Sequence, residues 1–373
     1  MVLPFTGGVV FLLSKQEPPM KILQLAPIWE TVPPPGYGGT EAVVSVLTEE
    51  LVRRGHEVLL CASGDSITSA NLFSVVPRSL RLAEKTSDAL QYTLVHVAES
   101  LKLAAGFDVV HNHNGPPADI AMAFGSTSPP MLTTLHNQPI DESAFIWNAY
   151  RGWYNAISDA QADSLPPLEQ ARFAGVVHNA IDVETFPFRC EKEDYLLFMA
   201  RLSPEKAPHL AIEAARLAGR RLIIAGKIST ADERAYFDSQ VAPLLASDVV
   251  YVGEASAAQK RELYAGAQAQ LIPLLWEEPF GLVAIEAMAC GTPAIAFRRG
   301  AMPELIDDGR TGFLVEDTEE MAAAIEKLDG IDALVCRQWV KARFSPEALA
   351  DKYLQVYNTM LDWKEVSPGH FSN

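Results

Sequence analysis

The chain has 373 residues, of which 49% are apolar and 21% are charged, so it is long enough for about two globular domains. Its formal net charge of −17, from 30 basic and 47 acidic residues, argues against nucleic acid and anionic lipid as partners. The four cysteines are scattered without metal-type spacing, as expected for buried, reduced thiols of a cytoplasmic protein. No apolar run reaches the length of a membrane span, so no integral membrane segment is expected.

Short β-rich runs alternate with helical patterns along the chain, which is typical of parallel α/β sheets. Met20-Lys-Ile-Leu-Gln-Leu-Ala-Pro27 reads as a first strand, so residues 1–19 are expected to be an unstructured extension. A helix is expected from Thr40 to Arg54, with Gly55 as its C-cap. The strands expected in the first half are Lys21–Ala26, Glu57–Cys61, Phe73–Val76, Asp108–His111, Met131–Leu135, Tyr154–Ile157 and Val176–His178.

The second half repeats this arrangement. We therefore predict two Rossmann-like β/α/β domains, 20–186 and 187–344, that face a central cleft where ligands bind. Residues 345–373 hold a last helix, from about Pro346 to Leu361, which can pack on either domain, and a tail. The expected strands are Tyr195–Ala200, Arg221–Ala225, Val249–Val252, Ala269–Pro273, Pro293–Phe297 and Gly312–Val315. The expected helices include Pro204–Ala218, Ala257–Ala265 and Ala284–Ala289.

A glycine-rich segment, Pro33-Pro-Pro-Gly-Tyr-Gly-Gly-Thr-Glu41, lies between the first strand and its helix. Gly36, Gly38 and Gly39 let the backbone approach a ligand closely. The helix that follows aims its free N–H groups at an anion, so the segment indicates a phosphate site. The alternative is a tight strand-to-helix turn with Thr40 as N-cap.

Two cations follow the first strand of the second half, in Met199-Ala-Arg-Leu-Ser-Pro-Glu-Lys206. Arg201 stands at the strand end and Lys206 at the start of the next helix. Two cations on such a loop can neutralise a diphosphate, which arginine grips with two parallel hydrogen bonds. The alternative is a solvated surface pair.

The most specific segment is Glu278-Pro-Phe-Gly-Leu-Val-Ala-Ile-Glu286. If it were fully helical, its two carboxylates would lie roughly 12 Å apart, near the length of a sugar–diphosphate–ribose unit. The N–H groups around Phe280, Gly281 and Leu282 would then lie beside the phosphates. Glu286 is surrounded by apolar residues, and a carboxylate in such a segment needs a partner.

These segments resemble the family 4 retaining glycosyltransferases of the GT-B fold, also called glycosyl transferases group 1, from Met20 to about Leu361. Each motif is modest alone, and their order and spacing together make the resemblance. Further matching segments are Thr134-Leu-His136, Asn179-Ala-Ile-Asp182, Gly291-Thr-Pro293 and Pro303-Glu-Leu-Ile-Asp-Asp-Gly-Arg-Thr-Gly312.

The resemblance implies a hexosyltransferase that takes its sugar from a nucleotide-diphosphate sugar, UDP-sugar ahead of GDP-sugar, with retention and with neither metal nor cofactor. Arg201 and Lys206 would meet the diphosphate, and Glu286 the ribose. Glu278 would contact the donor sugar and His136 would lie near the reacting centre, so these two are the implied catalytic residues. The implied donor-binding residues are Gly38, Gly39, Arg201, Lys206, Glu278, Phe280, Gly281, Leu282 and Glu286.

The sequence departs from the family in three small residues near the donor pocket. Ala180, Ala200 and Ala207 stand where the family often has glycine. These changes affect the expectation about donor identity more than the assignment itself. The acceptor is expected on the N-terminal domain, with Glu41, His113 and Asn114 as contacts, and a glycan, a small molecule and a lipid-linked sugar all stay open.

A rival interpretation is a metal-dependent hydrolase. His111 and His113 lie two residues apart on one face of an expected strand, His136 follows the next strand, and Asp119 is near in sequence. Three histidines and a carboxylate can hold Zn²⁺. A sugar-nucleotide epimerase and an α-glucan phosphorylase could share the fold, so both enzyme classes stay open. The non-enzymatic interpretation is a regulatory module that binds nucleotide without turnover.

Overall fold

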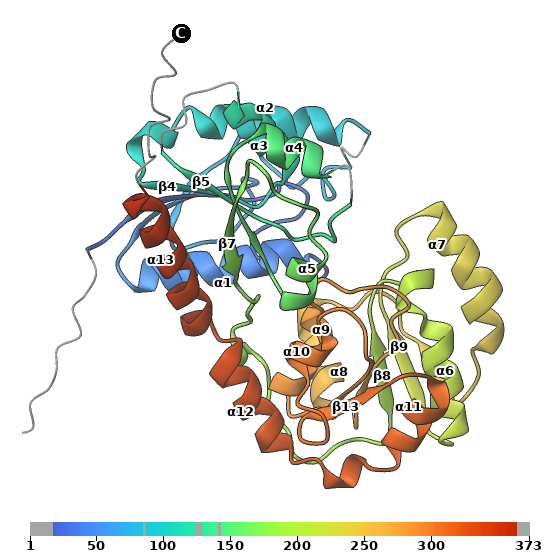
Figure 1. Cartoon of the computed structure of the whole chain (residues 1–373). Coiled ribbons are helices and arrows are strands. Elements are labelled where there is room, and N and C mark those ends of the chain that lie inside the picture. The colour runs from blue at the N-terminus through green and yellow to red at the C-terminus, as the bar shows by residue number, and fades with distance from the viewer. Residues whose placement is uncertain (1–17, 85–86, 124–128, 141–142, 364–373) are drawn as a thin grey trace, which may run out of the picture.

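The computed structural model describes residues 18–84, 87–123, 129–140 and 143–363, folded as two α/β domains (Figure 1). Each domain is built on one parallel sheet, of seven strands in the first and six in the second. The expected extension at 1–19 and the tail after 363 lie almost wholly outside the described residues.

The N-terminal sheet has the strand order β3-β2-β1-β4-β5-β6-β7. Its central strands are buried on both faces, as expected for strands of a parallel sheet covered by helices. The strands are β1 (Lys21–Leu25), β2 (Glu57–Cys61), β3 (Asn71–Phe73), β4 (Val109–Asn112), β5 (Met131–Thr134), β6 (Trp153–Ala156) and β7 (Arg172–Val176). The helices are α1 (Gly39–Arg53), α2 (Ala89–Leu101), α3 (Pro116–Ala123), α4 (Ser143–Ala149) and α5 (Asp159–Asp163).

The C-terminal sheet has the order β10-β9-β8-β11-β12-β13, with helices on both faces. One face packs on α8, α9 and α12, the other on α6 and α11. Its strands are β8 (Leu196–Met199), β9 (Leu222–Ala225), β10 (Val249–Tyr251), β11 (Gln270–Ile272), β12 (Ala294–Phe297) and β13 (Gly312–Val315). The helices are α6 (Pro208–Leu217), α7 (Ala231–Tyr236), α8 (Ala257–Gly266), α9 (Leu282–Ala289), α10 (Met302–Leu305), α11 (Thr318–Ile325) and α12 (Ala333–Arg343).

The last helix, α13 (Pro346–Asp362), returns to the N-terminal domain and packs beside α1 (Figure 1). Its buried side chains join one cluster with the strands of the first sheet and α1; from α13 these are Leu349, Ala350, Tyr353, Leu354, Val356, Tyr357 and Met360. Arg54 at the end of α1 also pairs with Asp351 of α13, at 2.5 Å. The sequence alone leaves the position of this helix open. No described helix combines the length and the apolar character needed to cross a bilayer.

Three expected elements are shifted in the structure. The strand expected at Val176–His178 is β7, which runs earlier, and the one expected at Phe73–Val76 is the short edge strand β3. The helix expected at Pro204–Ala218 breaks into a 3₁₀ turn at Pro204–Lys206 and α6, because Ala207 between them has left-handed backbone angles (φ 50°, ψ 54°). All four cysteines are free, and Cys190 is exposed, contrary to the expectation that all are buried.

Candidate functional site

A cavity of about 410 Å³ lies between the two domains, lined by residues of both. Its residues come from the carboxyl ends of strands: His136 follows β5, Arg201 follows β8 and Lys227 follows β9. Ligands of open parallel sheets bind at this edge, because the loops there carry no sheet hydrogen bonds and are free to supply side chains. The cavity is the size expected for a small-molecule site.

Two helix N-termini line this cavity. Gly38 (φ 146°) is the N-cap of α1 and Gly281 (φ 94°) that of α9, and neither cap has a side chain to bond the first amides. The structure therefore places the cap at Gly38 and not at Thr40, which is inside the helix. The two helix starts approach closely, since a Cβ on Gly39 would lie 3.4 Å from Leu282 Cδ1. The free N–H groups of both helices favour an anion between the domains.

The glycine-rich loop reaches across to the C-terminal domain. The amide of Ala257, at the start of α8, donates to the carbonyl of Pro35 over 3.0 Å. The Nζ of Lys227 lies 3.7 Å from the centre of the Tyr37 ring, a cation–π contact. The loop thus closes one side of the cavity against the C-terminal domain.

Arg201 lines the cavity with its guanidinium held by two carboxylates. Its Nη2 donates to Glu205 over 2.6 Å and its Nη1 to Glu233 over 3.0 Å. Glu233 is buried and also caps the start of α7. These bonds fix the direction of the guanidinium, and a bound diphosphate would compete with Glu205 for it.

Lys206 and Glu278 form an ion pair in the cavity wall. Glu278 also accepts a hydrogen bond from Nε1 of Trp276 over 3.0 Å, and Nζ of Lys206 lies 4.8 Å from the centre of the Trp276 ring. The expected diphosphate cation and the expected sugar-binding carboxylate therefore touch each other. The segment between the two glutamates is not fully helical, because α9 begins only at Leu282, so the expected separation of roughly 12 Å for a continuous helix does not apply.

Glu286 is buried on α9 with two partners from α8. Nζ of Lys260 donates to Oε1 over 2.6 Å, and the hydroxyl of the fully buried Tyr264 donates to Oε2 over 3.0 Å. The sequence indicates that this carboxylate needs a partner, and α8 supplies two. Phe280, Gly281, Leu282 and Glu286 all line the cavity.

His136 lines the cavity and is bonded through Nε2 to Nδ1 of His113, at 2.9 Å. Burial lowers the pKa of His136 to about 4, so the imidazole is neutral at pH 7. His113 is buried behind it, and the side-chain amide of Asn114 donates to the carbonyls of Leu25 and Ala26. Of the three expected acceptor contacts, Glu41 is therefore the one that lines the cavity.

The three histidines of the hydrolase interpretation do not form a metal site. Both ring nitrogens of His111 are bonded to protein groups, Nδ1 to the hydroxyl of Tyr357 and Nε2 to that of Thr134, each at 2.7 Å. Asp119 is directed elsewhere, to Thr133 Oγ1 at 2.6 Å and Asn112 Nδ2 at 3.3 Å. The hydrolase interpretation is therefore not favoured, because both ring nitrogens of His111 and both of His113 are bonded to protein groups.

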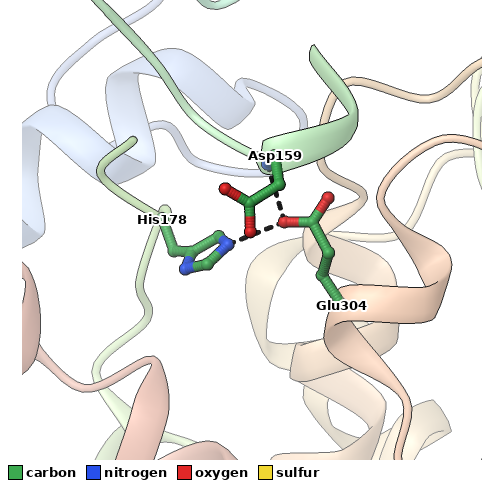
Figure 2. A group of neighbouring side chains, drawn as sticks. All are labelled: Asp159, His178 and Glu304. Carbon is green, nitrogen blue, oxygen red and sulfur yellow. Dashed lines mark hydrogen bonds and ion pairs between the residues drawn. The ribbon is translucent and has the colours of Figure 1, made fainter. Parts of the chain in front are cut away.

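A different group, Asp159, His178 and Glu304, has ligand atoms within 4.8 Å of one another (Figure 2). Glu304 of α10 accepts from the amides of Asp159 and Ala160 at the start of α5, and from His178 Nε2, each over 2.8 Å. These bonds join the two domains outside the cavity. Despite the desolvation of Glu304, its bond with His178 and the two amides lower the pKa of the carboxyl.

Several polar and aromatic residues of the cavity lining were not identified from the sequence, among them Tyr37, Lys227, Lys260 and Trp276. Among the ion pairs between described residues, none joins Lys227 to a carboxylate. The sequence did contain a pattern that could have identified Lys227, since Gly226-Lys227 follows a strand just as Arg201 does. Lys260 had no such signal, because it comes within a helix that meets Glu286 only in the folded chain.

Glu41 gives a testable pH dependence. Its burial, offset in part by backbone hydrogen bonds and reinforced by the carboxylate of Glu30, raises its pKa from 4.5 to about 7. Between these values the native state binds more protons than the unfolded chain, so stability falls as pH rises through this window. Between pH 5 and pH 8, the free energy of unfolding of the wild type is expected to fall by about 2 kcal/mol more than that of Glu41→Gln. Urea denaturation at each pH measures both. Parallel pH profiles for the two proteins would contradict this expectation.

Comparison with known proteins identifies two family matches that together span the cavity. Glycosyltransferase Family 4 matches residues 37–184, and Glycosyl transferases group 1 matches residues 184–331. The boundary between the matches falls between β7 and β8, where the chain passes from one sheet to the other.

Among curated relatives, a D-inositol 3-phosphate glycosyltransferase of Mycobacteroides abscessus is 35% identical over 219 residues, which are 53% of this chain and 49% of that protein. The chain thus matches about half the length of that relative. A glycogen synthase of Mycobacterium tuberculosis is 27% identical over 91% of this chain and 94% of its own.

Solved structures share the fold over nearly the whole chain. AviGT4, a glycosyltransferase involved in avilamycin A biosynthesis, has a TM-score of 0.71 at 25% identity and covers 93% of this chain and 100% of its own. HepE of Anabaena, solved with UDP and glucose, has a TM-score of 0.68 at 20% identity and covers 91% and 100%. With both family matches meeting at one interdomain cavity, the chain belongs to the family 4, or group 1, glycosyltransferases of the GT-B fold.

Proposed function

We propose that the protein transfers a hexose from a nucleotide-diphosphate sugar to an acceptor bound by the N-terminal domain. The observation that carries this proposal is the convergence of Arg201, Lys206 and Lys227 with the starts of α1 and α9 in one cavity. Five positive groups from four separate segments suit a diphosphate better than a neutral metabolite. The names of the relatives, a D-inositol 3-phosphate glycosyltransferase and a glycogen synthase, agree with this proposal.

Different parts of the cavity suit the two ends of such a donor, the ribose and the transferred sugar. Glu286 with Lys260 and Tyr264 forms a polar corner that suits ribose hydroxyls. Glu278 and His136 line the same cavity from opposite domains and suit the sugar and its reacting carbon. A UDP-sugar is proposed ahead of a GDP-sugar. The epimerase alternative, which would need no acceptor, is not favoured, because both family matches are to glycosyltransferases.

In the proposed reaction, the bond between the anomeric carbon and the diphosphate oxygen breaks while the acceptor oxygen bonds to the same carbon, and the proton of the acceptor hydroxyl passes to the leaving diphosphate. Arg201, Lys206 and the helix amides stabilise the negative charge that develops on the leaving diphosphate, so no metal is required. We propose retention of the anomeric configuration. NMR of the first product formed from an α-linked donor tests this point, since an α-glycoside is expected and a β-glycoside contradicts it.

The donor proposal predicts metal-independent stabilisation by one nucleotide. We expect UDP at 100 times its dissociation constant to stabilise the protein by about 2.7 kcal/mol, equally in Mg²⁺ and in EDTA. Thermal denaturation with UDP, GDP, ADP and TDP measures this effect. A shift seen only with Mg²⁺ would overturn metal independence, and no shift with any of the four would overturn the donor site.

A further inference from the structure

A buried hydrogen-bond chain connects His136 to the C-terminal helix α13. It runs through side chains that are far apart in sequence, and Tyr357 is 246 residues from its partner His111. Each hydroxyl has one proton to donate and each neutral imidazole one N–H, so the direction of every bond in the chain can be worked out from one end.

The starting point is Asn155. Its Nδ2 donates to the carbonyl of Ala156 over 3.1 Å, which leaves Oδ1 as the acceptor facing Thr134. The single hydroxyl proton of Thr134 is donated to this Oδ1 over 2.7 Å. Toward every other partner, Thr134 Oγ1 is therefore an acceptor.

The acceptor role of Thr134 then determines the direction of both hydrogen bonds of His111. Since Thr134 Oγ1 accepts, Nε2 of His111 at 2.7 Å must carry the proton. A neutral imidazole has one N–H, so Nδ1 of His111 is bare and accepts from the hydroxyl of Tyr357, also at 2.7 Å. Burial lowers the pKa of His111 well below its ordinary value, which keeps the ring neutral.

Tyr357 has then donated its proton, so its oxygen accepts from Nε2 of Gln24 in the longest link, at 3.5 Å. The opposite amide orientation would set two acceptors against each other. Gln24 Oε1 consequently faces His113 and accepts from Nε2 over 2.8 Å. This leaves Nδ1 of His113 bare, and it accepts from Nε2 of His136 over 2.9 Å.

We propose that this chain fixes His136 as the neutral tautomer with its proton on Nε2, so that Nδ1 offers a lone pair to a hydroxyl group of the donor sugar. Tyr357 and His113 are then positioning residues, and α13 belongs to the functional unit although it lies outside the cavity wall. Among the described residues, no hydrogen bond occupies Nδ1 of His136. The role toward a sugar hydroxyl depends on the proposed function, whereas the tautomer does not.

The tautomer is tested directly by long-range ¹H–¹⁵N NMR of the full chain labelled with ¹⁵N-histidine, in which protonated and bare ring nitrogens are distinguished. His136→Gln identifies the signals of His136. We expect a protonated Nε2 and a bare Nδ1 at pH 7 in the wild type. A protonated Nδ1 with a bare Nε2, or two exchanging tautomers, would overturn the proposal.

The relay is tested by a matched pair of variants on the same helix. Tyr357→Phe removes the proton that His111 accepts and the oxygen that Gln24 contacts, so the tautomer of His136 is expected to become mixed. The loss of these two contacts is expected to lower kcat by about three- to tenfold, which corresponds to the net free energy of about one hydrogen bond.

The control is Tyr353→Phe, which removes an equally buried hydroxyl that bonds to Thr134 at 3.0 Å. The proton of Thr134 still goes to Asn155, so the His136 spectrum should keep the wild-type pattern. Equal spectra for Tyr357→Phe and Tyr353→Phe would overturn the relay. If the wild-type tautomer were as expected but the protein bound no nucleotide, only the proposed function would be overturned.

Discussion

Arg201→Met is expected to lower kcat/KM for the nucleotide-sugar donor by about 100- to 1000-fold. The guanidinium lines the cavity, and its bond to the buried Glu233 can keep it oriented when a diphosphate takes the place of Glu205. Its positive charge stabilises the transition state more than the bound donor, because the leaving diphosphate gains negative charge as the bond breaks. Initial rates of nucleotide diphosphate release at varied donor concentration measure the effect.

Two further variants identify the cause of this loss. Arg201→Lys keeps the charge but not the two parallel hydrogen bonds, and should fall between the wild type and Arg201→Met. Arg216→Met is the matched control, because Arg216 pairs with Asp248 on the surface and does not line the cavity. If Arg201→Met stayed within about threefold of Arg216→Met, the diphosphate role of Arg201 would be wrong.

Gly300→Ala is expected to reduce both stability and donor binding, because residue 300 lies against the backbone of Glu278. A Cβ there would come within 2.3 Å of both the amide nitrogen and the carbonyl oxygen of Glu278. The positive φ of 52° adds backbone strain for alanine. Left-handed backbone costs about 1–2 kcal/mol and overpacking about 1–3 kcal/mol, so the melting midpoint should fall by roughly 10 °C.

Gly219→Ala separates the two effects. Gly219 has a similar φ of 64°, but a Cβ there would meet nothing within 4 Å. It should therefore show the backbone cost alone, with a smaller fall in the midpoint and unchanged nucleotide affinity by titration calorimetry. Equal midpoints for the two variants would show that the contact with Glu278 is not tight.

The backbone geometry of Ala207 explains one position at which the sequence departs from the family. The sequence shows only alanine where the family often has glycine, beside Lys206. The structure gives this residue left-handed angles, which glycine adopts without strain and alanine does not. The break in the predicted helix and the family's preference for glycine therefore have one physical cause.

The sequence determined the two sheets and the loops that carry the site. Short β-rich runs between helical patterns indicated the strands, and β2 and β13 were predicted at the residues where they occur. Glycine-rich and basic segments just after such strands indicated the cavity edge, because the carboxyl ends of parallel strands share one edge of a sheet.

Only the tertiary structure decided which side chains meet across that edge and behind it. The pair between Lys206 and Glu278, the bond of Lys260 to Glu286 and the packing of α13 on the first domain join residues far apart in sequence. Periodicity and spacing describe neighbours along the chain, whereas these contacts depend on how the two domains and the last helix pack. The polarity of the hydrogen-bond chain that ends at His136 also depends on a contact between strands, the bond that Thr134 of β5 donates to Asn155 of β6. The amide of Asn155 is oriented locally, by the carbonyl of its neighbour Ala156.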